Sequence, residues 1–564
     1  MKKSRIKIAA LLGVLLFGGA FWSFQSSDER SFQIVKSLDL FNSVYKELDL
    51  FYVDTINPKE LVEFGIQAML SKTDPYTEYY PEEDNTLKEM TRGKFGGIGS
   101  VVRYYAPKKK VAIIEPTEGS PAVEAGLKAG DIIMAINGKE MLQEGRKPNE
   151  FLEHVTDHLR GEPNTLCVLQ IERPTSDSTY VPMEIKVTRG MIRTNPVPYY
   201  GMVAPHVGYI AMSTFAMEGC SKDVKKALIE LREQGATSLV FDLRGNGGGL
   251  LSEAVEVVNY FVPKGKEIVV TKGKIKQAAS SYVTENEPIA LDMPMAVLVD
   301  GYTASAGEIF SGSLQDLDRA VVIGNRTFGK GLVQSLRDLP YNSSMKITTA
   351  KYYIPSGRCV QAIDYSKRNE DGSIARTPDS LCNVFHTAAG REVRDGGGIR
   401  PDVEVKKDVA PNILFYLMND DHIFDYVTRY VLKHPTIPAV KDFKLTDADY
   451  EEFKAILKER KFTYDRQSEA ILKKLKEVAE FEGYMEGASK EFDALEKKLE
   501  HNLDLELNKF SKDIRRTITL EILKRYYFER GSIEESLKED TDLKKALEIL
   551  GDSIQYRSLL TVKE

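Results

Sequence analysis

Cysteine and tryptophan are scarce in this chain, which has four cysteines and one tryptophan among 564 residues. The cysteines are Cys167, Cys220, Cys359 and Cys382, and none of them belongs to a C-x-x-C motif. This spacing excludes a zinc ribbon and a thioredoxin-like redox motif. A disulfide between Cys359 and Cys382 is open to the chain in an oxidising compartment, but we expect all four thiols to be free.

The chain also lacks a surplus of positive charge, because its 77 Lys and Arg residues stand against 84 Asp and Glu residues, a formal net charge of -7. A general nucleic-acid-binding protein would carry a basic surplus, so we expect no nucleic-acid partner. Histidine is scarce too, with seven residues. His154 and His158 have the i, i+4 spacing of a metal pair, but no third ligand lies nearby in the sequence, so no metal site is predicted.

A long apolar run, Ile8 to Phe24, follows a basic N-terminal stretch. A basic segment before an apolar segment is typical of an export signal, which predicts a periplasmic protein. The run is short for a membrane span and long for a cleaved signal peptide, and we favour an uncleaved inner-membrane anchor.

The chain is predicted to contain an export segment and four further regions: 1–27, 28–92, 93–190, 191–408 and 409–564. The second has apolar residues at helical spacing, and the third combines glycine-rich turns with short apolar runs, which predicts a small β-rich module with one helix. The fourth alternates apolar runs with helical patterns, as a buried parallel sheet requires.

The last region is rich in charged residues and helical patterns. Its amphipathic stripe consists of Phe492, Leu495, Leu499, Leu503, Leu507, Phe510 and Ile514. A face turned toward the region's own core is the simpler interpretation of this stripe. The alternative is a surface for a homodimer or an adaptor.

A candidate nucleophile, Ser305, follows the apolar run Ala296 to Val299 in the segment Asp300 to Glu308. Small residues surround this serine where a helix is predicted to begin. A helix N-terminus offers free N–H groups and the positive end of the helix dipole, which are the parts of an oxyanion hole. Taken alone, the segment is better explained by a helix cap at Thr303 or Ser305.

A serine nucleophile needs a base, and no histidine lies in a motif-like loop of the α/β region. The motif G-x-S-x-G is also absent at Ser305, so a Ser-His-Asp triad is poorly supported. Lysine is the other base known for this chemistry if it is buried and neutral. Lys330 fits, because it follows the apolar run Ala320 to Ile323 and lies between two glycines. Gln334 could hold its amine by a neutral hydrogen bond.

The segment Gly324 to Lys330 also matches the start of a phosphate-binding loop, G-x-x-x-x-G-K. That motif requires Ser or Thr at the next position to bind magnesium. This chain has Gly331 there, so we predict no nucleotide site.

Five segments together carry a resemblance to a known family: D-L-R-x-N-x-G-G from Asp242, T-A-S-A-G-E from Thr303, G-x-x-T-F-G-K-G-x-x-Q from Gly324, K-I-T-T-A-K-Y-Y-I-P-S-G-R from Lys346, and G-I-R-P-D from Gly398. With the β-rich module before them, they resemble the C-terminal processing (tail-specific) serine peptidases. The resemblance covers residues 35–407. It implies a multidomain α/β protein with a crotonase-like peptidase core, an inserted PDZ domain, and helical N- and C-terminal regions.

The resemblance also implies the roles of individual residues. Ser305 would be the nucleophile, Lys330 the general base and Gln334 the residue that orients it. The oxyanion hole would be formed by the N–H groups of Ala306 and of a glycine in the run 247–249, for which we choose Gly248. No cofactor and no metal are implied.

The PDZ domain is expected to bind proteins or peptides with free, apolar C-termini. A peptide adds a strand to a sheet edge and places its carboxylate in a nest of backbone N–H groups. The nest is predicted at Phe95, Gly97, Ile98 and Gly99. Arg160 resembles the PDZ arginine that couples substrate binding to the active state in the family, and the alternative is a charge at a helix end.

The predicted function is that of a serine endopeptidase for periplasmic protein processing or quality control. Two rivals remain open. The first is a PDZ scaffold with an inactive peptidase domain, against which the intact Ser305, Lys330 and Gln334 argue. The second is an acyl-transferring enzyme or lyase on a crotonase fold, against which the PDZ module and the export signal argue.

Overall fold

A computed structural model describes residues 29–82, 94–175, 179–275, 277, 279–369, 373–406, 409–499 and 502–562. The chain forms two compact units, Met1–Glu82 with Leu336–Thr348, and Glu83–Ser335 with Thr349–Glu564. The predicted export segment 1–27 lies outside the described residues. Within the described part, no helix has both the length and the apolar character that a membrane crossing needs.

The first unit contains a helix over residues 29–51, α2 (Pro58–Leu70) and β1 (Glu78–Tyr80). Asn57 begins α2 by accepting a hydrogen bond from the backbone N–H of Lys59 at 3.1 Å. β1 pairs antiparallel with the first residues of β18 (Ser344–Tyr353), where Glu78 lies opposite Lys346. Both helices lie in the region for which helical spacing predicted them.

The β-rich module of the second unit is a sheet in the order β3-β4-β5-β7-β8, with β6 paired to β5. Its elements are β3 (Ser100–Tyr105), β4 (Lys110–Pro116), α4 (Pro121–Glu124), β5 (Ile132–Ile136), β6 (Lys139–Glu140), α5 (Pro148–Leu159), β7 (Leu166–Pro174) and β8 (Tyr180–Thr188). β3 is the first strand in this order, so it forms an edge of the sheet. β2 (Lys94–Gly97) pairs instead with β9 (Gly190–Arg193).

The peptidase core is built on a six-stranded sheet in the order β10-β11-β12-β15-β16-β21. Its strands are β10 (Tyr199–Ala204), β11 (Val207–Ala211), β12 (Ser238–Asp242), β15 (Met295–Val299), β16 (Val321–Gly324) and β21 (Val403–Glu404). β10 is antiparallel to β11, and the neighbouring pairs from β11 to β21 are parallel. Every residue of β12, β15 and β16 is buried, which explains why these strands are continuous apolar runs in the sequence.

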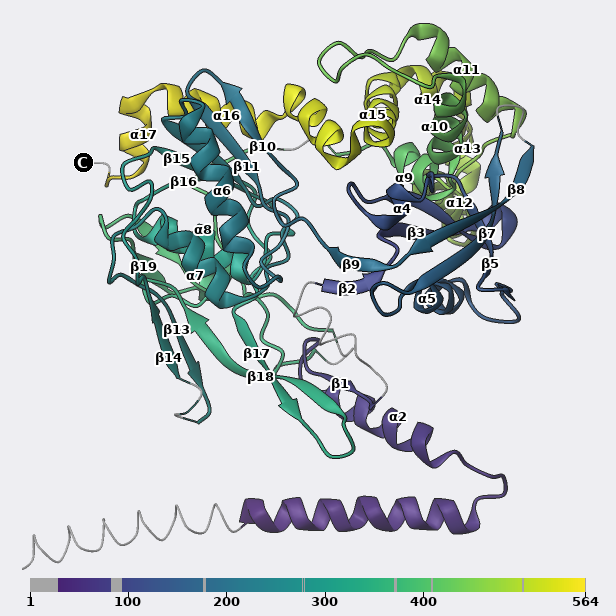
Figure 1. The fold of residues 1–564 in the computed structure, drawn as a ribbon. Coiled ribbons are helices and arrows are strands. Elements are labelled where there is room, and N and C mark those ends of the chain that lie inside the picture. The colour runs from purple at the N-terminus through teal and green to yellow at the C-terminus, as the bar shows by residue number, and fades with distance from the viewer. Residues whose placement is uncertain are drawn as a thin grey trace, which may run out of the picture. The chain divides into compact units, whose positions relative to one another are not determined.

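Helices cover both faces of this sheet (Figure 1). On one face lie α6 (Cys220–Glu233), α7 (Leu251–Asn259) and α8 (Ala306–Asp316). On the other lies α16 (Thr541–Gly551), whose residues Leu543, Ala546 and Ile549 are buried against strand residues such as Val240 and Leu298. The sheet is therefore completed by residues from the end of the chain.

Smaller strands lie beside the main sheet. They are β13 (Glu267–Gly273), β14 (Ser280–Val283), β17 (Leu332–Asp338), β19 (Val384–His386) and β20 (Glu392–Arg394). The last residues of β18 pair antiparallel with β13, and β19 pairs with β20. β17, which follows Lys330, also pairs with β18.

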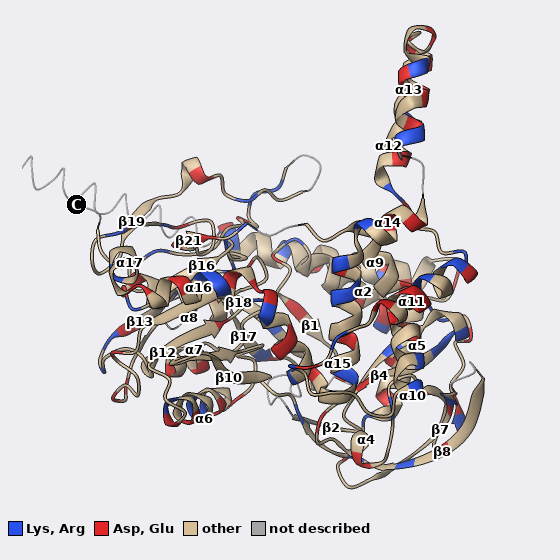
Figure 2. Cartoon of the chain, turned by 90° about the horizontal axis from the view of Figure 1, so that it is seen from above, with Lys and Arg blue, Asp and Glu red and all other residues tan. Residues whose placement is uncertain are grey.

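A helical domain follows the core, with α9 (Asn412–Asn419), α10 (His422–Lys433), α11 (Asp447–Glu459), α12 (Gln467–Phe481), α13 (Met485–Leu499), α14 (Leu503–Lys509) and α15 (Ser511–Ser536). Figure 2 shows α12 and α13 as a hairpin that extends from this domain, with acidic and basic residues along it. Leu507 and Ile514 are buried in the domain, whereas Leu495 is 43% exposed. The predicted stripe thus faces the core only in its second half.

The region that the sequence analysis treated as one domain, 409–564, contributes to two separate hydrophobic clusters. One contains residues from Ile413 to Leu523, and the other joins Leu537 and α16 to the peptidase sheet. Tyr556, in α17 (Ser553–Leu559), accepts a hydrogen bond from Met295 N at 3.0 Å. Because α16 buries its apolar residues against the sheet and α17 packs beside it with Tyr556 and Leu559 partly buried, the last helices cover the peptidase core.

Candidate active site

Ser305 occupies the turn between β15 and α8, directly before the first residue of the helix. Its backbone has φ 54° and ψ -115°, which is uncommon for any residue other than glycine. Such a conformation costs about 1–3 kcal/mol and persists only where surrounding contacts hold it. The turn therefore holds this serine in a strained backbone conformation.

Glu308 supplies much of the holding contact. This carboxyl group is fully buried and accepts hydrogen bonds from Ser305 N at 2.9 Å and Lys330 N at 2.8 Å. It also accepts from Gly329 N at 2.8 Å and from the Thr327 hydroxyl at 2.5 Å. One side chain therefore joins the serine turn to the lysine loop.

Burial raises the pKa of the Glu308 carboxyl to about 7, against the lowering effect of the hydrogen bonds that it accepts. Tyr352 joins the same two segments through a second contact. Its hydroxyl donates to Lys330 O at 2.8 Å and lies 3.2 Å from Ser305 O. Complete burial holds the pKa of Tyr352 well above its usual value, so the hydroxyl stays a donor.

Lys330 lies in the loop between β16 and β17, and Gln334 is the third residue of β17. Both side chains are half-buried. The preceding Gly329 has φ 88°, and a Cβ there would lie 2.4 Å from the Cβ of Ala362. The predicted need for glycine beside the lysine thus has a steric cause.

The glycine-rich loop after β12 lies directly against Ser305. A Cβ on Gly248 would be 2.7 Å from the Ser305 Cβ and 2.9 Å from Ala306 N, so only glycine fits there. Ala306 is the first residue of α8, and its N–H therefore has no acceptor within the helix. The N–H of Gly248 donates to Asn246 Oδ1 at 2.9 Å. The chosen glycine is thus adjacent to the serine, but its N–H already has an acceptor.

Of the four residues predicted for the PDZ nest, Ile98 and Gly99 lie between β2 and β3. Ile98 is 3% exposed and packs in the module's core, so it can offer only its backbone to a ligand. Its carbonyl accepts from Ala122 N at 2.8 Å, and that of Gly99 accepts from Thr117 N at 3.0 Å. Phe95 and Gly97 belong to β2. The carbonyl contacts of Ile98 and Gly99 fix the loop that leads into the edge strand β3.

Arg160 is the exposed residue that ends α5. The buried arginine nearby is Arg189, which the sequence analysis did not single out. Its Nε donates to Leu159 O at 3.0 Å and its Nη2 to His158 O at 2.8 Å, which satisfies carbonyls at the end of the helix. Arg189 lies 30 positions after Leu159, the last residue of α5, so the local sequence gave no signal of this contact.

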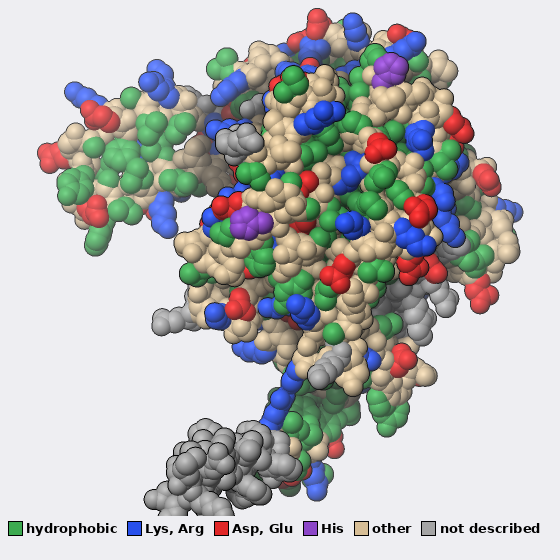
Figure 3. All heavy atoms as spheres, turned by 90° about the vertical axis from the view of Figure 1, so that its left-hand side faces the viewer, with side chains coloured by type: hydrophobic (Ala, Val, Ile, Leu, Met, Phe, Trp, Pro, Cys, Tyr) green, Lys and Arg blue, Asp and Glu red, His purple; other side chains and the backbone are tan. Residues whose placement is uncertain are grey.

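The rings of His154 and His158 lie 4.6 Å apart on α5. No group of three or more potential metal ligands occurs among the residues that the structure describes. All four cysteines are free thiols, as expected from the sequence. On the face of the molecule in Figure 3, acidic and basic side chains are interspersed, so neither sign forms a continuous field there.

A cavity of about 440 Å³ lies between the β-rich module and the helical domain. Its lining includes Leu127, Arg173, Val431, Lys524 and Tyr526. None of the predicted catalytic residues lines it, so this cavity is a feature of the contact between two domains.

Comparison with known proteins matches residues 206–366 to peptidase family S41, residues 113–173 to the PDZ domain, and residues 413–550 to the C-terminal helical domain of probable PDZ-proteases. A carboxy-terminal-processing protease of Bartonella bacilliformis is 34% identical over 333 residues, which cover 58% of this chain and 73% of that protein. The chain belongs to peptidase family S41. This S41 peptidase is a serine-type enzyme of the carboxy-terminal-processing group and carries a PDZ domain.

A second relative agrees with this assignment. A probable CtpA-like serine protease of Staphylococcus aureus is 33% identical over 329 residues, covering 57% of this chain and 62% of that protein. Among solved structures, the photosystem II D1 C-terminal processing protease is 26% identical, with a TM-score of 0.35, over 66% of this chain and 94% of that one. The S41 family, the PDZ domain and the helical C-terminal region are confirmed.

Proposed function

We propose that this S41 peptidase cleaves proteins near an exposed, apolar C-terminus, with Ser305 as nucleophile and Lys330 as general base. The observation that carries the proposal is the shared acceptor Glu308, which bonds the backbone N–H groups of both residues. A nucleophile and a base act together only when their relative position is fixed. The crotonase-like character of the core remains a prediction from the family resemblance.

In the proposed reaction, neutral Lys330 accepts the proton of the Ser305 hydroxyl as its Oγ attacks the substrate carbonyl. The resulting oxyanion is stabilised by the N–H of Ala306. Lys330 then gives its proton to the leaving amine, and water hydrolyses the acyl-enzyme by the same steps in reverse. Gln334 orients the lysine amine by a neutral hydrogen bond.

The glycine-rich loop would provide the second oxyanion donor. Gly248 is the nearest candidate, since a Cβ there would touch both Ser305 and Ala306. Its N–H must leave Asn246 Oδ1 to serve in this role, because the two groups are bonded at 2.9 Å. Substrate binding would therefore rotate the peptide group before Gly248, while the two ends of the loop stay in place.

The PDZ domain would receive the substrate's C-terminus along β3, with the carboxylate in the nest at Gly97 to Gly99. The position of β3 at the sheet edge supports this mode, because a strand can be added only at an edge. We further propose that the protein is exported and anchored by residues 1–27, on the strength of the basic and apolar segments in the sequence.

The test is proteolysis of an unfolded protein by the wild type and by Ser305→Ala, Lys330→Ala and Lys222→Ala. Loss of either member of the pair should lower the rate by at least about 10³-fold, because nucleophile and base act as a unit. Lys222 is an exposed lysine of α6 and provides the matched control, for which we expect wild-type activity. Retained activity in folded Lys330→Ala would show that another group is the base.

A further inference from the structure

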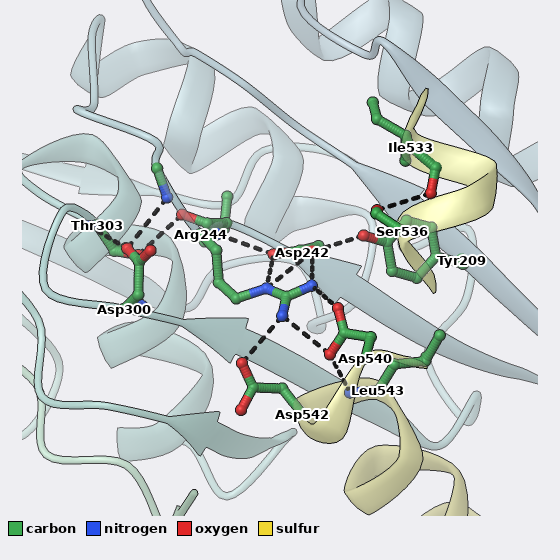
Figure 4. Close-up of polar contacts among 12 residues, drawn as sticks. Tyr209, Asp242, Arg244, Asp300, Thr303, Ile533, Ser536, Asp540, Asp542 and Leu543 are labelled. Atoms are coloured by element: carbon green, nitrogen blue, oxygen red, sulfur yellow. Dashed lines mark hydrogen bonds and ion pairs between the residues drawn. The ribbon is translucent and has the colours of Figure 1, made fainter. Parts of the chain in front are cut away.

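Arg244 lies two residues after β12 and immediately before the glycine-rich loop. Its guanidinium group binds three carboxylates, those of Asp242, Asp540 and Asp542 (Figure 4). Asp242 is part of the same strand end, whereas the other two come from the start of α16, almost 300 residues later. A single side chain therefore connects the glycine-rich loop to the end of the chain.

The contact between Arg244 and Asp540 has the geometry of a two-point fork. Nη1 donates to Asp540 Oδ1 at 3.0 Å and Nη2 donates to Oδ2 at 2.6 Å. Asp542 accepts from Nη1 at 2.9 Å and its side chain is 1% exposed. Paired hydrogen bonds between charged groups fix orientation more strongly than a single contact, so the guanidinium group is held in one place.

Burial of these carboxylates makes the contact specific. The side chain of Asp540 is 11% exposed and that of Arg244 is 18% exposed. Burial alone would raise the pKa of Asp540, but the bonds from Arg244 outweigh it and leave the pKa below its usual value. Asp540 also accepts from Leu543 N at 2.9 Å and thereby begins α16.

The loop next to Arg244 is bonded to the turn that carries Ser305. Gly245 N donates to Asp300 Oδ1 at 3.0 Å, and the Thr303 hydroxyl donates to Leu243 O at 2.8 Å. Ala304 N donates to Asn246 O at 2.9 Å. Figure 4 shows Asp300 and Thr303 on one side of Arg244 and the acidic pair of α16 on the other. The loop thus lies between two sets of fixed groups.

We infer that Asp540 and Asp542 act through Arg244 as positioning residues, which hold the glycine-rich loop in the register that completes the oxyanion hole beside Ser305. The helix α16 then contributes to catalysis through Arg244, in addition to covering one face of the sheet. This inference rests on the proposed function, because it assumes that Ser305 reacts beside this loop.

The alternative is that the cluster only stabilises the fold, and the apolar contacts of α16 make the two roles separable. Leu543, Ala546 and Ile549 are buried against the sheet independently of the acidic pair. The double variant Asp540→Asn/Asp542→Asn should therefore keep α16 in place. It removes both charges from Arg244, while Asp242 remains as its partner.

The chain offers a matched control in Arg391, a second buried arginine held by two carboxylates. Its Nε donates to Asp318 at 2.6 Å and its Nη1 donates to Asp402 at 2.6 Å. The double variant Asp318→Asn/Asp402→Asn makes the same chemical change at a cluster outside the glycine-rich loop. If the Arg244 cluster were purely structural, the two double variants would show equal changes in kcat and in labelling rate.

The experiment compares three quantities in the wild type and the two double variants: kcat and KM on a peptide substrate, the rate at which a fluorophosphonate labels Ser305, and the melting temperature. For Asp540→Asn/Asp542→Asn we expect kcat and the labelling rate to fall about tenfold to a hundredfold with KM within about twofold, since full loss of one oxyanion donor costs 10²–10³ in kcat. The control should keep kcat within about twofold, whatever its melting temperature.

Arg244→Lys serves as a second test, because it keeps the charge and loses the fork. We expect its kcat to fall and its KM to stay near the wild-type value. Wild-type kcat and labelling rate in a folded Asp540→Asn/Asp542→Asn variant, or an equal loss of kcat in both double variants, would overturn the inference. Failure of the proposed function looks different, since Ser305→Ala would then keep its activity and the wild type would resist labelling.

Discussion

The peptidase core and the PDZ domain present backbone N–H groups to a substrate in opposite ways. In the core, the turn of Ser305 is held by a fully buried carboxyl group, that of Glu308, and by the Tyr352 hydroxyl. In the PDZ domain, β3 lies at the edge of its sheet, and the nest is fixed through its carbonyl groups. The core therefore keeps the contacts of Glu308 and Tyr352 throughout the reaction, whereas the PDZ domain leaves the edge of its sheet open for a peptide.

This difference follows from what each site must do. Chemistry requires groups that do not reorganise during the reaction, and a strained serine with a buried carboxylate beside it meets that requirement. Binding and release require contacts that solvent can replace. The comparison predicts that substitutions of the groups that hold the Ser305 turn lower kcat, while substitutions in the PDZ domain change substrate preference alone.

Glu308→Gln is expected to have the largest effect. An amide has one oxygen and one NH2 group, so it cannot accept from all four donors that face the carboxylate, and a buried donor left without an acceptor costs about 1–3 kcal/mol. We expect kcat to fall about a hundredfold or more. The free energy of unfolding should fall by less than this 1–3 kcal/mol, because the neutral amide avoids the cost of burying a charge. Steady-state kinetics and denaturant unfolding measure the two quantities.

Glu253→Gln is the matched control for this substitution. Glu253 also accepts from backbone N–H groups at a helix start, those of Gly219 at 2.8 Å and Ser221 at 2.9 Å, but on α6. We expect it to lose stability and keep kcat. If Glu308→Gln behaved like Glu253→Gln, the core would not depend on its buried carboxylate for catalysis.

The sequence predicted the elements that carry the catalytic residues because their signals are local. The apolar run Ala296 to Val299 lies in β15, and the helix predicted to begin near Ser305 is α8, Ala306–Asp316. Each fully buried strand is recognisable from its own residues. The same holds for the glycines, whose neighbours leave no room for a Cβ.

Contacts between distant segments could not be predicted in this way. Glu308 has the spacing of a helix cap to Ser305, and its bonds to Gly329 and Lys330 depend on how two loops meet. The link from Arg244 to Asp540 spans 296 positions, and the charged character of both residues is equally typical of a solvated surface. The packing of the last helices on the peptidase core could not be predicted either, since an apolar stripe does not reveal which surface it covers.

A pair of peptides, one with a free apolar C-terminus and one amidated, tests the PDZ side of the comparison. Amidation replaces the anion that the nest at Gly97 to Gly99 would bind, and a charge-assisted hydrogen bond is worth about 1.5–3 kcal/mol. We expect the free peptide to have a kcat/KM about tenfold to a hundredfold higher. Arg160→Ala should reduce this preference if Arg160 couples binding to the active state, and equal rates on both peptides would remove C-terminal selection from the proposal.

The pH dependence of kcat and of peptide binding should distinguish the peptidase core from the PDZ domain, because the core contains Glu308, whose carboxyl titrates near neutral pH. Burial raises the pKa of Glu308 from the ordinary 4.5 to about 7, so the folded state holds this proton more tightly than the unfolded chain does. Its contribution to stability is full below about pH 4.5 and is lost as the pH rises through about 7, a change of up to about 3 kcal/mol.

Activity should change in the opposite direction, because only the carboxylate accepts from all four donors and only neutral Lys330 is a base. Between pH 6 and pH 8 we expect kcat to rise up to about tenfold while the free energy of unfolding falls, and the Kd of a free-C-terminus peptide to stay constant, since its carboxylate is ionised throughout. The measurements are kcat, denaturant unfolding and peptide anisotropy at each pH, with Glu308→Gln as the variant that should lose the fall in stability and keep the rise due to Lys330. Stability that increases with pH across this range would contradict the raised pKa of Glu308, and a Kd that follows kcat would mean that the two sites share the titrating group.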